Sequence, residues 1–280
     1  LGSELTEPEN GVSRITRHAM AGGIDLDNFE VPTRANNKYV RDMFEEAKKL
    51  KEKFPNQDIN PFTVGPISLA TELRPIEMFL RDLRIDPEGA KELLDFVTKS
   101  SLTFIEEFTR EFGKAEAFIP DPISSSDLLS ENQFANYSFP YLNELIDGIN
   151  EITGYKPTLH ICGHTKKFWS YLYELNISSF SVDNCEDMGE TKEKFGDKFT
   201  VIGNIPPTEI MRFGSPKDVV EAVKDCIKKA ADSPNGYILN LGCDMPIGTS
   251  EENIAAFFYA ARKYGADAKM GEIPEAVYQD

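Results

Sequence analysis

Three residues with the chemistry of metal ligands lie in two short segments of the chain. His160 and Cys162 are two positions apart at the end of an expected β-strand, so their side chains point to the same face of it. Cys243 closes another expected strand. One histidine nitrogen and two thiolates form a ligand set suited to Zn²⁺. Three protein ligands, rather than four, leave one position open, as catalytic zinc sites do.

The alternative for each of these residues is packing, because unpaired cysteine is among the most often buried residue types. The coincidence of all three at strand ends favours the metal site. Cys226 falls within an expected helix and is predicted to pack. Cys185 follows a strand end and is a weaker ligand candidate, and His164 is expected beside the site or on the surface.

Three further polar residues follow expected strands and are candidate substrate-binding residues: Asp121, Asp183 and Asn204. The carboxyl ends of parallel strands meet on one side of an α/β fold, where active sites form. For Asp183 and Asn204, stabilisation of a turn is an equally good interpretation. Asp127, in a run after three serines, is expected to cap a helix. The sequence contains no glycine-rich phosphate loop.

Short apolar runs alternate with amphipathic segments from Pro61 onward, which is typical of β/α units. The expected strands are 62–64, 117–119, 158–162, 179–182, 200–203 and 237–241. Expected helices begin at Asp86-Pro87, Ser215-Pro216 and Ser250, where capping side chains precede helical periodicity. The pattern predicts an α/β fold with a parallel sheet, either a barrel or an open doubly wound sheet.

The domain organisation expected from this pattern is a single domain in two parts. Residues 1–60 form an irregular N-terminal segment with one charged helix near 38–53, and residues 61–280 form the β/α body. A complete eight-fold barrel would need two more strands, and only the N-terminal side has room for them. A barrel is therefore expected to lack its N-terminal strands or to have them irregular.

The composition excludes several classes of partner. Acidic residues outnumber basic ones 47 to 30, which gives a net charge of −17 and argues against nucleic acid or an anionic membrane. No segment approaches the ~20 apolar residues of a membrane span. Four cysteines are too few for a disulfide scaffold, so the chain is expected in the cytoplasm with its thiols reduced.

Several segments together resemble the uroporphyrinogen decarboxylase superfamily. They are His160-Ile161-Cys162-Gly163, Gly203-Asn204-Ile205-Pro206-Pro207 and the run from Gly242 to Ile254. Within that superfamily the chain is most similar to the zinc-containing, corrinoid-dependent methyltransferases of the methylcobamide:coenzyme M type. The resemblance covers roughly residues 61–265.

The resemblance implies a (β/α)8 TIM-type barrel with His160, Cys162 and Cys243 as zinc ligands and, through the zinc, as the catalytic residues. It implies transfer of a methyl group from a methylated corrinoid, carried by a partner protein, to a small thiol such as coenzyme M. Zn²⁺ and the corrinoid are the implied cofactors. The oligomeric state stays open.

Three alternatives remain at this stage. A relative could move a methyl group from a donor onto the corrinoid, with zinc polarising the donor. A truncated barrel could bind metal or a partner without turnover. A uroporphyrinogen decarboxylase-like enzyme is disfavoured, because Arg14 and Arg17 do not match the arginine-rich N-terminal motif of true decarboxylases. Those enzymes also lack the zinc cysteines.

Overall fold

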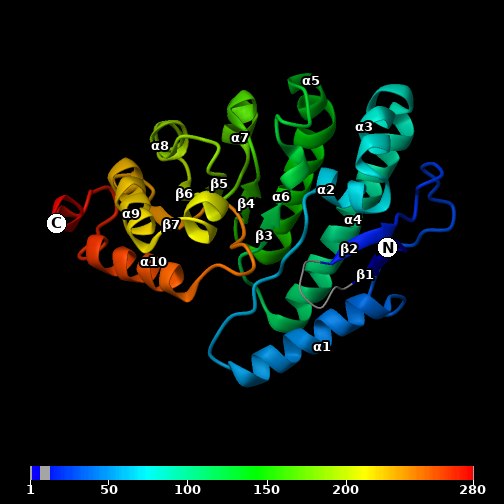
Figure 1. Cartoon of the computed structure of the whole chain (residues 1–280). Helices are drawn as coiled ribbons and strands as arrows, with labels where there is room; N and C mark the ends of the chain where they lie inside the picture. The colour runs from blue at the N-terminus through cyan, green and yellow to red at the C-terminus, as the bar shows by residue number, and fades with distance from the viewer. Residues whose placement is uncertain (1, 7–12, 280) are drawn as a thin grey trace. The chain divides into compact units, whose positions relative to one another are not determined.

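The computed structural model of the chain describes residues 2–6 and 13–279 (Figure 1). The contacts divide it into two compact units. The first comprises Leu1–Ser124 and Leu129–Thr158, and the second comprises Ser125–Leu128 and Leu159–Asp280. The short segment Ser125–Leu128 thus belongs with the C-terminal residues, although the chain on both sides of it belongs to the first unit. Each unit is described separately below.

The first unit is mainly helical. A short antiparallel hairpin, β1 (Glu4–Thr6) and β2 (Arg14–Arg17), precedes the helices. The elements that follow are α1 (Lys38–Lys53), α2 (Pro66–Leu73), α3 (Ile76–Ile85), α4 (Pro87–Phe112), β3 (Phe118–Pro120), η1 (Pro122–Ser124), α5 (Glu131–Gln133), the π-helical turn η2 (Phe134–Ser138) and α6 (Phe139–Thr153).

Capping residues fix where these helices begin and end. The Asp86 side chain accepts a hydrogen bond from the amide of Gly89 at the start of α4, and Pro87 occupies the first turn. The helix ends at Gly113, which has a φ of 92°. The charged helix expected near residues 38–53 is α1, and Asn37 caps it. Aromatic rings then join α1 to α4, because Phe44 contacts Phe104 and Phe108 edge-on.

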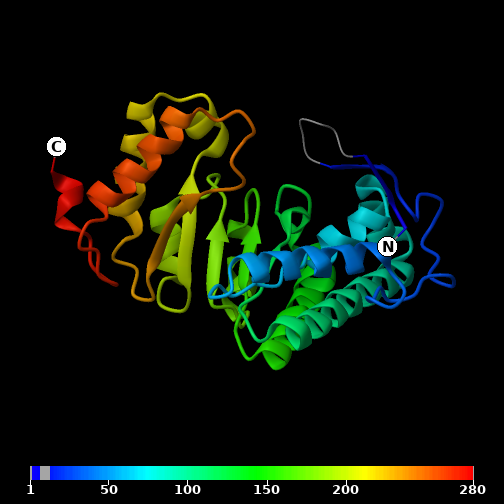
Figure 2. The same ribbon diagram turned by 90° about the horizontal axis from the view of Figure 1, so that it is seen from below.

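The second unit alternates strands and helices, as Figure 2 shows. Its elements, with the strand that enters it, are β4 (Thr158–Ile161), η3 (Lys166–Phe168), α7 (Trp169–Glu174), β5 (Ser179–Val182), α8 (Met188–Phe195), β6 (Thr200–Ile205), the π-helical segment η4 (Pro207–Arg212), α9 (Pro216–Ala230), β7 (Tyr237–Leu241), α10 (Glu251–Tyr264) and η5 (Glu275–Tyr278). Neighbouring strands are parallel, with Phe180 opposite Val201 and Ile202 opposite Ile238.

The strand order β3-β4-β5-β6-β7 follows the chain, as it does in a β/α barrel, and confirms the predicted α/β class. Among the described residues, hydrogen bonds do not close these strands into a ring. The strand expected at 62–64 appears in shortened form, as a parallel bridge between Phe62 and Phe118. The amides of Thr63 and Gly65 donate to the carbonyl oxygens of Phe118 and Pro120, so the segment pairs with β3. Pro61 lacks an amide hydrogen and α2 begins at Pro66, which limits the pairing to these few residues.

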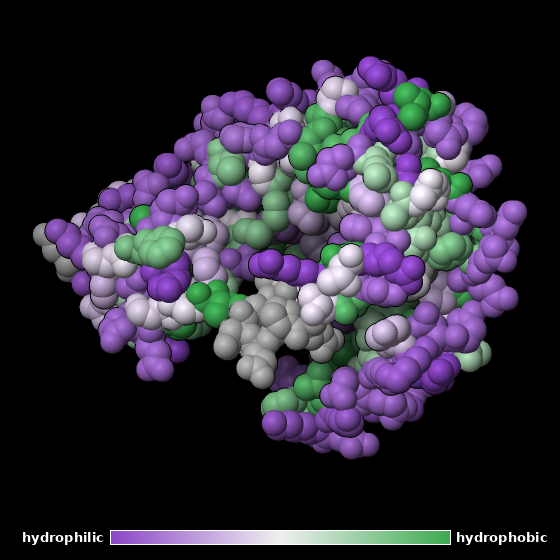
Figure 3. All heavy atoms as spheres, turned by 45° about the vertical axis from the view of Figure 1, so that its right-hand side comes forward, coloured by the Kyte–Doolittle hydropathy of each residue, from purple (hydrophilic) through white to green (hydrophobic). Residues whose placement is uncertain are grey.

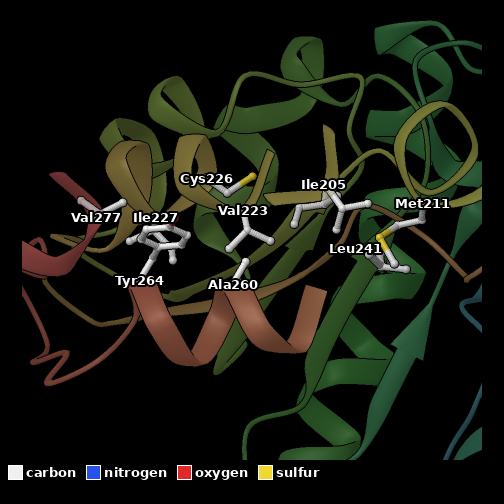
Figure 4. Packing of buried hydrophobic residues seen from close by; sticks show 10 residues of the cluster. Ile205, Met211, Val223, Cys226, Ile227, Leu241, Ala260, Tyr264 and Val277 are labelled. Carbon is white, nitrogen blue, oxygen red and sulfur yellow. The ribbon is translucent and has the colours of Figure 1, made fainter. Parts of the chain in front are cut away.

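The core of the second unit lies between the sheet and its last two long helices. Val223 and Ile227 of α9 point toward Ala260 and Tyr264 of α10 (Figure 4). Ile205 of β6 is fully buried in the same cluster. The cluster contains the last residues of β6 and β7, Ile205 and Leu241, and Cys243 lies two positions beyond the latter.

Hydrophilic side chains cover most of the face drawn in Figure 3, in keeping with the high content of acidic residues. In the described part of the chain, no helix has the length and apolar character that crossing a membrane requires.

We expect Ile205→Ala to lower the free energy of unfolding of the second unit by about 2–5 kcal/mol, because it leaves a cavity in this core. Ile247→Ala is the matched control, since that isoleucine is 70% exposed, and we expect a change within about 0.5 kcal/mol. The measurement is urea unfolding followed by the fluorescence of Trp169, the single tryptophan of the chain. Equal losses in the two variants would contradict the described packing.

Candidate metal centre

The structure brings His160, Cys162 and Cys243 together within the second unit. Their ligand atoms all lie within 4.8 Å of one another. His160 Nε2 is 3.0 Å from Cys162 Sγ, and the two sulfur atoms are 3.3 Å apart. His160 sits in β4, Cys162 directly follows that strand, and Cys243 follows β7. The three side chains therefore meet at the carboxyl ends of parallel strands.

Hydrogen bonds orient the imidazole of His160. Its Nδ1 lies 3.1 Å from the carbonyl oxygen of Ser181 and 3.1 Å from the hydroxyl of the same residue. Nδ1 can donate to the carbonyl oxygen, and its Nε2 lies on the side of the cysteines. Metal-binding histidines are commonly held by the protein through their second nitrogen in this way.

The sulfur atoms of the two cysteines lie within hydrogen-bonding distance. A hydrogen bond from Cys162 to the sulfur of Cys243 lowers the pKa of Cys243 and raises the pKa of Cys162. Burial and the negative charges of Asp183 and Asp244 raise the pKa of Cys162 further. Two thiolates at this separation would repel each other strongly in the absence of a cation between them.

The donor set fits a zinc ion. Tetrahedral zinc, with bonds of about 2.3 Å to sulfur and about 2.0 Å to nitrogen, places its ligand atoms about 3.5–3.8 Å apart. The His160–Cys162 and Cys162–Cys243 distances are about 0.5 Å shorter than that spacing. Three ligands from the protein would leave one coordination position for a substrate atom. Among the described residues, no second group of histidine, cysteine or acidic side chains is gathered in this way.

The loop that carries Cys162 is shaped by carboxylates. Gly163 has a φ of 70°, and a Cβ there would lie 2.4 Å from Asp127 Oδ2. The Gly163 amide donates to Asp183 Oδ2 at 2.9 Å. The amide of Thr165 donates to Glu186 Oε1 at 2.5 Å. The conformation of the loop thus depends on acidic side chains from other segments.

Two of the expected substrate-binding residues lie beside this loop and already bind protein groups. Asp183, which is 8% exposed, also accepts a hydrogen bond from the amide of Cys185. The side-chain amide of Asn204 donates to the carbonyl oxygens of Asp183 and Glu186, at 3.0 and 2.8 Å. Both residues stabilise the turn after β5, and their contact with a substrate stays a prediction.

The third expected substrate-binding residue, Asp121, belongs to the first unit. It is fully buried, and its carboxylate accepts hydrogen bonds from the hydroxyls of Ser68 and Ser124. Burial raises its pKa, and these hydrogen bonds oppose that effect. A Cβ at Gly65 would lie 2.3 Å from its Cγ, so the approach to α2 requires glycine. These contacts join the end of β3 to α2, and a role in substrate binding remains a prediction.

The expectation that Asp127 caps a helix is wrong. Its carboxylate accepts from the backbone amide of His164 and pairs with that residue's Nδ1, both at 2.9 Å, while Ser130 caps α5. His164 is exposed, and the Asp127 carboxylate raises its pKa. Cys226 is buried in α9, as predicted from its helix position.

Two residues of the site were missed in the sequence, Ser181 and Glu186. The alternation of side chains along a strand could have indicated Ser181. This residue lies two positions before Asp183 and so faces the same side of β5. Glu186 carried no periodic signal. Its contacts join loops about 20 residues apart in the chain.

The chain was compared with known families and proteins. The family model described as uroporphyrinogen decarboxylase (URO-D) matches residues 1–264. A methylated-thiol–coenzyme M methyltransferase of Methanosarcina mazei is 26% identical over 212 residues, 73% of this chain and 53% of that protein. A methylcobamide:CoM methyltransferase of Methanosarcina acetivorans is 28% identical over 223 residues, 79% of this chain and 63% of that protein.

Decarboxylases are also among the relatives. The chloroplastic uroporphyrinogen decarboxylase 2 of Oryza sativa subsp. japonica is 29% identical over 177 residues, 63% of this chain and 44% of that protein. The chain thus spans between about half and two thirds of the length of the methyltransferases described above.

A solved structure of similar fold is a methyltransferase from Methanosarcina mazei. It superposes with a TM-score of 0.80 over 95% of this chain and 76% of that one, at 22% identity. This likeness supports the barrel-type fold expected from the sequence. Since the family model spans nearly the whole chain, the protein belongs to the uroporphyrinogen decarboxylase family.

Proposed function

We propose that the protein is a zinc-dependent methyltransferase that moves a methyl group from a methylated corrinoid on a partner protein to a small thiol such as coenzyme M. The observation that carries the proposal is the cluster of His160, Cys162 and Cys243, whose donor atoms suit a zinc ion with one open position. The names of the two Methanosarcina relatives support the thiol as acceptor.

The protein's own residues would supply the metal site and its shape. Ser181 would hold the imidazole of His160 so that Nε2 faces the ion. Cys162 and Cys243 would bind as thiolates, and their charge would be balanced by the cation. When bound, zinc lowers the pKa of the acceptor thiol, and the corrinoid provides the methyl group and retains the bonding electron pair as Co(I).

Acidic side chains lie near the sulfur atoms of the cluster. Asp183 and Asp244 add negative charge near the sulfurs, and this charge favours retention of a divalent cation. We include Asp183 and Asn204, which hold the turn beside the loop of Cys162, as residues that shape the substrate side of the site. Asp121 remains in the proposal as a substrate-binding residue on the ground of its sequence position after a strand. Transfer from a methyl donor to the corrinoid is the alternative within the same family.

We expect the purified chain to hold about one zinc ion, and Cys162→Ser to lose it, because a serine hydroxyl is a poor ligand for zinc. Cys185→Ser is the matched control, since that cysteine is exposed and lies outside the cluster. Zinc is measured by inductively coupled plasma mass spectrometry after gel filtration. Retention of zinc by Cys162→Ser, or its loss from Cys185→Ser, would show that the ligands are assigned wrongly.

We expect the zinc-loaded chain to convert methylcobalamin and coenzyme M to cob(I)alamin and a thioether under anaerobic conditions. Absorbance of the corrinoid and mass spectrometry of the thioether measure the reaction. Cys243→Ser should reduce the rate at least about 100-fold, because a bound metal contributes several kcal/mol of transition-state stabilisation. Cys185→Ser should leave the rate unchanged.

A zinc-loaded chain that leaves methylcobalamin intact with every thiol tested would contradict the acceptor chemistry. Formation of methylcobalamin from cob(I)alamin and a methyl donor would establish the reverse direction. Release of CO2 from uroporphyrinogen without methyl transfer would place the chain with its decarboxylase relatives.

A further inference from the structure

Four consecutive backbone amides after Cys162 donate to carboxylates. Gly163 donates to Asp183, and the next residue, His164, donates to Asp127. The amides of residues 165 and 166 both donate to Oε1 of Glu186, at 2.5 and 2.8 Å. Successive amides that point to one side form a natural anion-binding cradle. Here the protein fills that cradle with its own acidic side chains.

Glu186 is more buried than Asp127. It has 7% of its surface exposed, close to the 8% of Asp183, whereas the side chain of Asp127 is 50% exposed. It also binds two amides with one oxygen, so its removal would leave two donors without their partner. One of them belongs to Thr165, which is fully buried and receives a hydrogen bond from the indole of Trp169.

The backbone of Glu186 is itself held in place. Its amide donates to the carbonyl oxygen of Asp183 at 3.2 Å, and its own carbonyl oxygen accepts from the side chain of Asn204 at 2.8 Å. The carboxylate therefore extends from a fixed turn after β5 to the loop after β4. Only three residues of that loop separate Cys162 from Lys166. The position of Lys166 therefore restricts the direction of the Cys162 side chain.

We propose that Glu186 is a positioning residue, which sets the zinc affinity of the site by fixing the loop of Cys162 without touching the metal. The inference rests on the proposed function, because it requires that His160, Cys162 and Cys243 bind zinc. A ligand held in place before binding loses less conformational freedom when the metal arrives. Residues that orient metal ligands in this way typically contribute about 10–100-fold to metal affinity.

Two conservative variants separate the reach of this side chain from its charge. Glu186→Asp keeps the negative charge but shortens the side chain by one methylene, so the carboxylate no longer reaches both amides. Glu186→Gln keeps the length and an acceptor oxygen but removes the charge. Glu190→Asp is the matched control, because Glu190 pairs with the side chain of Lys166 on the same loop and binds none of these four amides.

The zinc dissociation constant of the full-length chain is measured by competition with a chromophoric chelator, and the ligand field by the spectrum of the Co(II)-substituted chain. Urea unfolding of the metal-free chains reports stability separately. We expect Glu186→Asp to weaken zinc binding about 10-fold and to alter the Co(II) spectrum. We expect Glu186→Gln to bind more tightly than Glu186→Asp, and Glu190→Asp to match the wild type.

Failure of the positioning role and failure of the proposed function give different results. Wild-type affinity in Glu186→Asp would overturn the positioning role, and so would tighter binding by Glu186→Asp than by Glu186→Gln, because charge would then matter more than reach. Equal weakening by Glu190→Asp would also overturn it. Absence of zinc binding by the wild-type chain would instead overturn the proposed function.

Discussion

The site depends on one electrostatic constraint, which is that two cysteine sulfurs are held 3.3 Å apart beside carboxylates. A hydrogen bond between the two thiols shifts the pKa of Cys162 upward and that of Cys243 downward. A divalent cation bound between them would offset the repulsion of two thiolates and could also bind a nitrogen of His160. The parallel sheet makes this arrangement accessible, because it places the ends of β4 and β7 on the same side of the second unit.

Hydrogen bonds and packing within the second unit hold the three candidate ligands in place. Ser181 fixes the imidazole, Asp183 and Glu186 fix the loop of Cys162, and Asn204 fixes the turn from which both acidic residues extend. The packing between α9 and α10 includes Leu241, two positions before Cys243. The cluster is thus supported from several elements of one unit. This is the kind of preorganisation that a metal site with an open position needs.

Helix caps and strand alternation in the sequence predicted the parts of the fold that depend on residues close together in the chain. Capping by Asp86 and Ser215 located the starts of α4 and α9, and strand alternation placed His160 and Cys162 on one face. The strand expected at Phe62 is shorter than predicted, because Pro61 and Pro66 limit its pairing with β3 to a few residues. The role of Asp127 and that of Glu186 arise from hydrogen bonds between loops distant in sequence, and such contacts leave no periodic pattern. The same holds for the burial of Asp121 against α2.

The most direct test of the account is zinc X-ray absorption spectroscopy of the loaded chain, recorded with and without a small thiol. The central claim is that the protein supplies two sulfurs and one nitrogen and leaves a position open for a thiol. It predicts two sulfur neighbours around zinc without the thiol and three with it. A sulfur count that does not change when saturating thiol is added would contradict the claim, and so would a zinc ion surrounded only by nitrogen and oxygen.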